Sequence, residues 1–272
     1  MTMGFIEDTA REVLEFTTEA VFSERYARKD GLLQKLDPRL KIVSLILLVA
    51  TVVSLQDIRV IGAFYLLALA LAVLSKLPTT EFTKRVWVFI PIFTGVIAIP
   101  SIFMLPGETA FKILDIRATW EGIRWATLFT LRVATTVSYA VLFTMTSRWN
   151  EMVSALASFR VPDMVITITT LTYRYVFLLA KLLLDAMHAR RARLVGELGM
   201  MESWREAGKH IGATFIKANT LGEELYYAML SRGYVNEVQP LGEFRFDNLD
   251  YAFSALTALI VILAVAFTRG LL

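Results

Sequence analysis

Two segments of the sequence carry an arginine at the end of an apolar helical stripe. Both place their residues at offsets of 0, 4, 7 and 11: Leu182, Ala186, Ala189 and Arg193 in the first, and Leu221, Leu225, Ala228 and Arg232 in the second. At helical periodicity these positions share one face. Apolar side chains can fill a groove on a partner while the guanidinium makes paired hydrogen bonds to a carboxylate. The repeat therefore predicts two docking points.

The residues around each arginine define the two candidate sites. Ala192 and Leu194 flank Arg193, and Arg190 and Arg191 are further candidate docking cations beside it; Ser231 and Gly233 flank Arg232. Gly233 can adopt the left-handed conformation that ends a helix. The alternative is that the first cluster only marks the cytoplasmic side of a membrane protein and Arg232 only complements a helix dipole. The repeated spacing favours docking.

Other chemistries find little support in the sequence. There is no phosphate-binding loop, because Gly208-Lys209-His210 lacks both the upstream glycine and the hydroxyl residue. The chain is thus expected to carry no catalytic residue and no cofactor of its own. Without cysteine, and with only His188 and His210, it is expected to bind no metal. A net charge of +3 is too small to indicate a nucleic-acid partner.

Composition indicates a protein of the lipid bilayer. Hydrophobic residues make up 56% of the 272 residues and charged residues 19%, with mean hydropathy +0.56, whereas soluble domains average about 25% charged residues. We expect an all-α integral membrane protein with about five transmembrane helices and a cytoplasmic helical domain before the last span. The expected spans are 40–55, 58–74, 86–105, 123–145 and 251–267. The expected domains are an N-terminal segment (1–35), spans one to four (36–147), the cytoplasmic coupling domain (148–248) and the last span (249–272).

Several polar residues have structural interpretations. Asp37 and Pro38 predict the start of the first span, with Lys41 near the lipid headgroups. Arg132 lies deep in the fourth span, so we expect it to pair inside the subunit or with a partner subunit. We also expect a kinked third span, because it contains two prolines, and a polar loop over 105–121.

The distribution of basic residues predicts the topology. Basic residues gather before the first span, between the second and third, and after the fourth, which predicts a cytoplasmic N-terminus and a C-terminus outside. The stretch 164–184 is apolar enough to span, but a span there would place Arg190 and Arg191 outside. We therefore interpret it as an amphipathic helix at the cytoplasmic face. Segment 1–35 is either an interfacial helix or a solvated helix docked on a partner.

Four stretches carry a family resemblance: Leu36-Asp37-Pro38-Arg39-Leu40-Lys41, Leu171-Thr172-Tyr173-Arg174-Tyr175, Ala189-Arg190-Arg191-Ala192-Arg193, and Ala228-Met229-Leu230-Ser231-Arg232-Gly233-Tyr234. With the order of spans, they make the chain resemble the transmembrane T component of energy-coupling-factor (ECF) transporters, a class of ABC importers. The N-terminal segment is more similar to that of the cobalt/nickel-type branch, the Q subunit.

The resemblance implies a scaffold in the cell membrane that works with two ABC-type ATPase subunits and a small substrate-binding membrane subunit. In that family, two short motifs with a central arginine dock into the ATPases, which bind ATP and Mg. These motifs correspond to Ala192-Arg193-Leu194 and Ser231-Arg232-Gly233; Leu194 departs from the usual small residue, so Arg190 or Arg191 remain alternatives. The rival interpretation is a stand-alone polytopic carrier or enzyme that binds an anionic substrate through its arginines.

Overall fold

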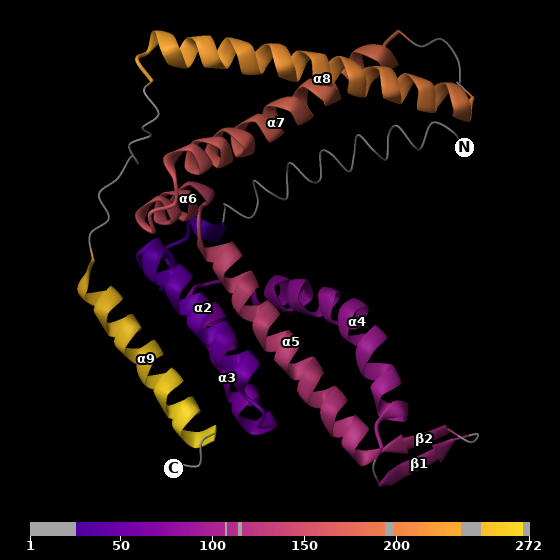
Figure 1. Cartoon of the computed structure of the whole chain (residues 1–272), viewed down its shortest axis with the longest axis vertical. Helices are drawn as coiled ribbons and strands as arrows, with labels where there is room; N and C mark the ends of the chain where they lie inside the picture. Colours follow the sequence, from indigo (N-terminus) through magenta and orange to yellow (C-terminus); the bar gives the residue numbers. More distant parts are fainter. Residues whose placement is uncertain (1–25, 107, 114–115, 194–198, 235–245, 269–272) are drawn as a thin grey trace. The chain divides into compact units, whose positions relative to one another are not determined.

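The structure is a computed structural model that describes residues 26–268 except 107, 114–115, 194–198 and 235–245 (Figure 1). The chain divides into two compact units. We call residues 24–152 with 243–272 the bundle unit, and residues 1–23 with 153–242 the arm unit. The segment 1–25, which includes most of the predicted N-terminal segment, lies outside the described residues.

The bundle unit is built from helices that overlap all five expected spans, and the third of them begins at Thr79, seven residues before the expected start. Its elements are a 3₁₀ turn η1 (Leu33–Lys35), α2 (Pro38–Ser54), α3 (Ile58–Leu74), α4 (Thr79–Met104), β1 (Thr109–Ile113), β2 (Ile116–Thr119), α5 (Trp120–Thr146) and α9 (Asn248–Thr268). α5 packs against α2, α3 and α4, and α9 packs against α2. The predicted all-α membrane class is confirmed.

Side-chain caps fix where the first two helices begin. The carboxylate of Asp37 accepts a hydrogen bond from the Arg39 backbone N–H at 2.8 Å, and Pro38 takes the first position of α2. Asp57 caps α3 in the same way through Arg59, at 2.9 Å. Caps of this kind satisfy N–H groups that have no partner inside the helix.

The predicted kink in the third span is present. α4 includes Pro91 and Pro100, and Figure 1 shows its ribbon bending within the helix. Proline removes a backbone hydrogen bond and its ring presses on the preceding turn, so a bend is the expected consequence.

The segment expected to be only a polar loop contains a β-hairpin. β1 and β2 pair antiparallel, from Thr109 opposite Thr119 to Ile113 opposite Ile116. Thr119 then caps α5, accepting from the Gly122 N–H at 3.2 Å. A Cβ on Gly122 would lie 2.8 Å from the Cα of Ile102, so α4 and α5 meet here at a distance only glycine permits.

Side chains from several helices form the core of the bundle unit. Val52 of α2, Ile61 of α3 and Met145 of α5 have no exposed surface, and Phe64 and Ala264 belong to the same cluster. Small residues such as Ala68 and Ala72 are also fully buried, as expected where membrane helices approach closely.

The arm unit follows α6 (Trp149–Ser158), which runs across the boundary between the units. It consists of the rest of that helix, then α7 (Asp163–Arg191) and α8 (Met200–Ser231). α7 and α8 pack against each other. Figure 1 shows α7 crossing α8 near the C-terminal end of α7, on the N-terminal half of α8.

By length and composition, three of the described helices are able to cross a membrane. They are Trp120–Thr146, Asp163–Ala189 and Asn248–Phe267, and the shorter apolar helices are Ile58–Leu74 and Thr94–Met104. α5 and α9 match expected spans. α7 also meets the criterion, as its hydropathy predicted, although the distribution of basic residues favours an interfacial position.

Candidate docking surface

Arg232 is the residue that caps the C-terminal end of α8, and backbone hydrogen bonds close this end. Gly233 has φ of +75°, so the predicted helix stop is confirmed. The Gly233 N–H donates to the Leu230 carbonyl and the Tyr234 N–H to the Met229 carbonyl, both at 3.0 Å. This pair of bonds is the Schellman arrangement, which satisfies carbonyls that the helix leaves open.

The Arg232 end is also tied to the start of α7. The hydroxyls of Tyr234 and Thr167 lie 3.2 Å apart, within hydrogen-bonding distance. Ser231 donates its hydroxyl back to the Ala228 carbonyl at 3.0 Å, while Ser231, Arg232 and Gly233 are all exposed. The backbone is therefore held in place while the guanidinium faces outward.

Arg193 occupies the turn that follows α7. The N–H of Ala192 donates to the His188 carbonyl at 3.1 Å, and Ala192 and Arg193 are exposed. The side chains of the other two candidate cations, Arg190 and Arg191, and the whole of Leu194 lie outside the described part of the structure. Of the three candidate arginines, Arg193 is the one whose side chain the structure describes, and it is accessible to a partner.

The leucines of the two stripes are more covered than the arginine ends, whereas Ala189 and Ala228 are exposed. Leu182, Leu221 and Leu225 are half-buried, whereas Arg193 and Arg232 are exposed. The leucines are therefore partly covered within the chain, and a partner would meet mainly the arginine ends.

The two arginine ends are far apart. Arg193 follows the end of α7, close to where α7 crosses the N-terminal half of α8, and Arg232 closes the other end of α8 (Figure 1). Half of this 32-residue helix measures about 24 Å at ~1.5 Å per residue. The two guanidinium groups cannot converge on one small ligand.

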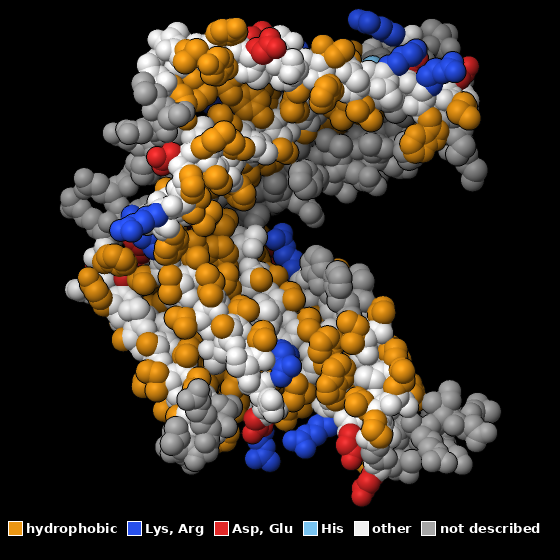
Figure 2. All heavy atoms as spheres, viewed as in Figure 1, with side chains coloured by type: hydrophobic (Ala, Val, Ile, Leu, Met, Phe, Trp, Pro, Cys, Tyr) orange, Lys and Arg blue, Asp and Glu red, His pale blue; other side chains and the backbone are white. Residues whose placement is uncertain are grey.

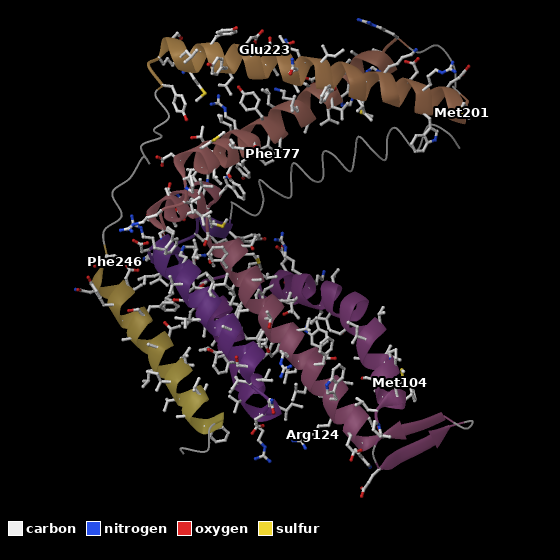
Figure 3. All side chains as sticks on the ribbon, viewed as in Figure 1. Met104, Arg124, Phe177, Met201, Glu223 and Phe246 are labelled. Carbon is white, nitrogen blue, oxygen red and sulfur yellow. The ribbon has the colours of Figure 1, made fainter. Side chains whose placement is uncertain are left out.

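A second surface on α8 was missed from the sequence. Large apolar side chains stand out along the helix, with Met201 80% and Phe215 75% exposed, together with Trp204, Ile211 and Tyr226. Figure 2 shows hydrophobic side chains along α8, and Figure 3 draws the side chains of this helix as sticks, with Met201 and Glu223 labelled. The signal was a second stripe at three- and four-residue spacing, on a different face from the arginine stripe. An apolar face of this extent indicates a surface that a partner protein or a membrane covers.

Arg132 pairs inside the bundle unit. Its Nη2 donates to the carbonyl of Leu55, which caps the C-terminal end of α2, at 2.5 Å. A cation at a helix C-terminus complements the helix dipole. Of the two predicted pairings, the structure shows the one inside the subunit. It connects α5 to the end of α2.

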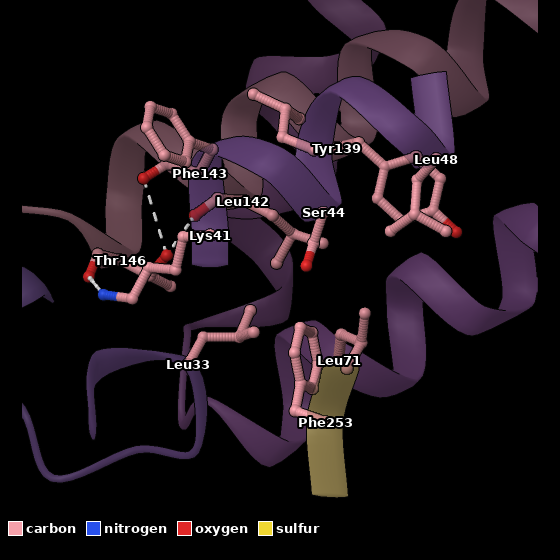
Figure 4. A pocket seen from close by; sticks show the side chains of 11 residues that line it. Leu33, Lys41, Ser44, Leu48, Leu71, Tyr139, Leu142, Phe143, Thr146 and Phe253 are labelled. Atoms are coloured by element: carbon pink, nitrogen blue, oxygen red, sulfur yellow. Dashed lines mark hydrogen bonds between the residues drawn. The ribbon is translucent and has the colours of Figure 1, made fainter. Parts of the chain in front are cut away.

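Lys41 is buried in the bundle unit, whereas the sequence predicted a side chain near lipid headgroups. Only 4% of the residue is exposed, and its Nζ donates to the Thr146 carbonyl at the end of α5, at 3.2 Å (Figure 4). Nearby, Asp250 of α9 accepts from the N–H groups of Asp37 and Asp247, each at 2.9 Å. The starts of α2 and α9 and the end of α5 are thereby joined by buried polar contacts.

The described residues around Lys41 and Asp250 offer no metal cluster and no cavity large enough for a substrate. No group of three or more histidines, cysteines or acids gathers in the part of the chain that the structure describes. The cavity in Figure 4, between Lys41, Tyr139 and Phe253, has a volume of about 40 Å³. That volume accommodates little more than water.

Known proteins match along nearly the whole chain. A family model described as CbiQ, cobalt transport protein, matches residues 30–241. An uncharacterized protein of Methanocaldococcus jannaschii is 46% identical over all of this chain and 95% of its own length. The energy-coupling factor transporter transmembrane protein EcfT of Thermanaerovibrio acidaminovorans is 26% identical, covering 81% of this chain and 86% of its own. The EcfT protein of Heliobacterium modesticaldum is 28% identical over 45% of this chain and 46% of its own.

Proposed function

The chain belongs to the CbiQ family of cobalt transport proteins, and from this membership we propose that it is the coupling subunit of an ECF importer. Two relatives are named as transmembrane proteins of energy-coupling factor transporters. The chain would carry no catalytic residue and no cofactor, because partner ATPases would bind ATP and Mg and hydrolyse the nucleotide.

The separation of the two exposed arginine ends is the observation that carries the proposal. Arg193 and Arg232 lie too far apart for one small anion, so two protein partners fit them better than one substrate. Arg132, the remaining cation of the rival carrier, already donates to the Leu55 carbonyl. The rival interpretation therefore loses the convergent cations it needs.

The proposed mechanism assigns different roles to the two faces of the arm unit. Each arginine would bind a carboxylate on one ABC-type ATPase, and closure of the ATPases on ATP would move α7 and α8. The exposed apolar face of α8, from Met201 to Tyr226, would hold the small substrate-binding membrane subunit. Motion at the arginine ends would then reach that subunit through a continuous helix.

We extend the proposal to topology and solute. From the distribution of basic residues, the N-terminus would lie in the cytoplasm and the C-terminus outside the cell membrane, with α7 at the cytoplasmic face. The family description favours a transition-metal ion, cobalt or nickel, as the imported solute. The metal would be selected by the substrate-binding subunit.

Co-purification tests this proposal directly. The tagged chain is extracted in detergent from its native membranes, in parallel with Arg232→Glu and with Lys217→Glu as a matched control. Lys217 is an exposed cation within the same helix, away from its end. Wild type and the control should bring down ATPases and a small membrane protein, and Arg232→Glu should lose ATPase.

Isolation of the wild-type chain without an ATPase would refute the coupling role. Equal loss of ATPase in both variants would show that any charge reversal on α8 disrupts the complex, and the assignment to Arg232 would fail. The metal content of the co-purified membrane subunit tests the solute separately.

A further inference from the structure

A groove of about 450 Å³ lies between α4 and α5 in the bundle unit. The two helices come together at the hairpin, where Met104 ends α4 and Arg124 lies near the start of α5 (Figure 3). α4 bends away from α5 along its length (Figure 1), and Phe82, Val86 and Ile90 in its first half lie in the same buried core as residues of α5. The groove extends along α4 from Ile102 to Trp87, about 22 Å of helix at ~1.5 Å per residue.

The walls of the groove suit hydrocarbon. Its apolar lining includes Gly95, Ala98, Ile99, Ala126, Leu131 and Ala134. The hydroxyl of Thr94 donates to the Ile90 carbonyl at 2.5 Å and that of Thr127 to the Ile123 carbonyl at 2.8 Å, so both are already used. A polar ligand would be desolvated there with little compensation.

The Trp87 end of the groove has the character of a membrane–water interface. The indole N–H of Trp87 donates to the hydroxyl of Tyr65 at 3.3 Å, and both rings line the groove. Lys84, one helical turn before Trp87, is exposed, and the adjacent Arg85 is half-exposed. The acid in this turn, Glu81, accepts a hydrogen bond from Tyr26 at 2.6 Å. Aromatic rings next to cations are typical of the level at which lipid headgroups lie.

We propose that this groove is a binding site for an anionic membrane lipid. One acyl chain lies between α4 and α5, and Lys84 and Arg85 hold the phosphate of the headgroup. The bound acyl chain fills the groove and packs against both α4 and α5.

Native mass spectrometry of the purified full chain in detergent tests the site with two probes, phosphatidylglycerol and phosphatidylcholine. Gly95→Leu fills the groove, since a Cβ on Gly95 meets only the end of Ile99, at 3.8 Å. Thr130→Leu fills it from the α5 wall. Gly62→Leu is the matched control, because a Cβ there meets nothing within 4 Å and Gly62 does not line the groove.

Wild type and Gly62→Leu should bind one phosphatidylglycerol in preference to phosphatidylcholine. Both filling variants should bind it roughly tenfold more weakly, since displacing even two buried methylenes has that effect. The double variant Lys84→Gln, Arg85→Gln should retain a lipid but lose the preference for phosphatidylglycerol. Circular dichroism confirms that each variant is folded, and Thr130→Leu carries the test if Gly95→Leu is not.

Two results would overturn the proposal. Unchanged phosphatidylglycerol binding in a folded filling variant would show that the lipid binds elsewhere. Filling variants that keep the lipid but release the small membrane subunit from the assembled complex would assign the groove to a protein helix. Because the lipid measurement uses the chain alone, its outcome does not depend on ATPase docking.

Discussion

The bundle unit buries many of its large apolar side chains, whereas α8 of the arm unit leaves such side chains exposed. In the bundle unit, Val52, Ile61 and Met145 are completely buried, and polar groups such as Asp250 are buried with partners. In the arm unit, none of the described side chains of α8 is buried, and Phe215 is 75% exposed. In the bundle unit these side chains find their partners within the unit, whereas the apolar surface of α8 remains available for other molecules to cover.

This contrast separates two sources of stability. Buried contacts between helices hold the bundle unit, so substitutions there should act on folding. The described part of α8 has few such contacts, so substitutions there should act on assembly. The predictions below test that division, from the largest expected effect to the smallest.

Asp250→Ala should have the largest effect on folding. It removes the acceptor for the buried Asp37 N–H and the part-buried Asp247 N–H, and leaving these donors unpaired is expected to lower the free energy of unfolding by about 2–4 kcal/mol. Denaturation in mixed micelles measures this. The matched variant in the arm unit is Lys209→Ala, which removes the exposed pair with Glu206 and should cost no more than about 0.5 kcal/mol. Similar losses in the two variants would contradict the contrast.

Gly122→Ala and Gly222→Ala make the same chemical change in the two units. A Cβ on Gly122 would lie 2.8 Å from Ile102, whereas one on Gly222 meets nothing within 4 Å. Forcing α4 and α5 apart should lower stability by about 1–3 kcal/mol. Alanine within α8 should instead raise helix stability by about 0.5–1 kcal/mol. Thermal unfolding of both variants in detergent should show shifts of opposite sign, and shifts of the same sign would argue against the packing described here.

The bundle helices were predictable because local signals specify them. Uncharged apolar runs gave the spans, and Asp37 with Pro38 gave the start of α2, where capping depends only on adjacent residues. The role of Lys41 was not predictable, because its acceptor at Thr146 lies 105 residues away in sequence. A lysine at the edge of an apolar run looks the same whether it faces headgroups or a carbonyl.

Local sequence signals also predicted part of the candidate site. Gly233 predicted the end of α8, because the left-handed backbone conformation that ends a helix favours glycine. The apolar face of α8 was overlooked because its residues interleave with those of the arginine stripe on another face of the same helix, so the sequence does not show one simple amphipathic pattern. The hairpin before α5 was missed because its strands are four and five residues long, too short for alternation to stand out.

The central claim is that the two arginine ends hold two separate ATPases. Native mass spectrometry of the intact complex can count ATPase copies in wild type, Arg193→Ala, Arg232→Ala and the double variant. Each single substitution should weaken docking at its own end by about 2–4 kcal/mol if the arginine meets a buried carboxylate. The account predicts two copies in wild type, one in each single variant and none in the double variant. A double variant that retains both ATPases would contradict it.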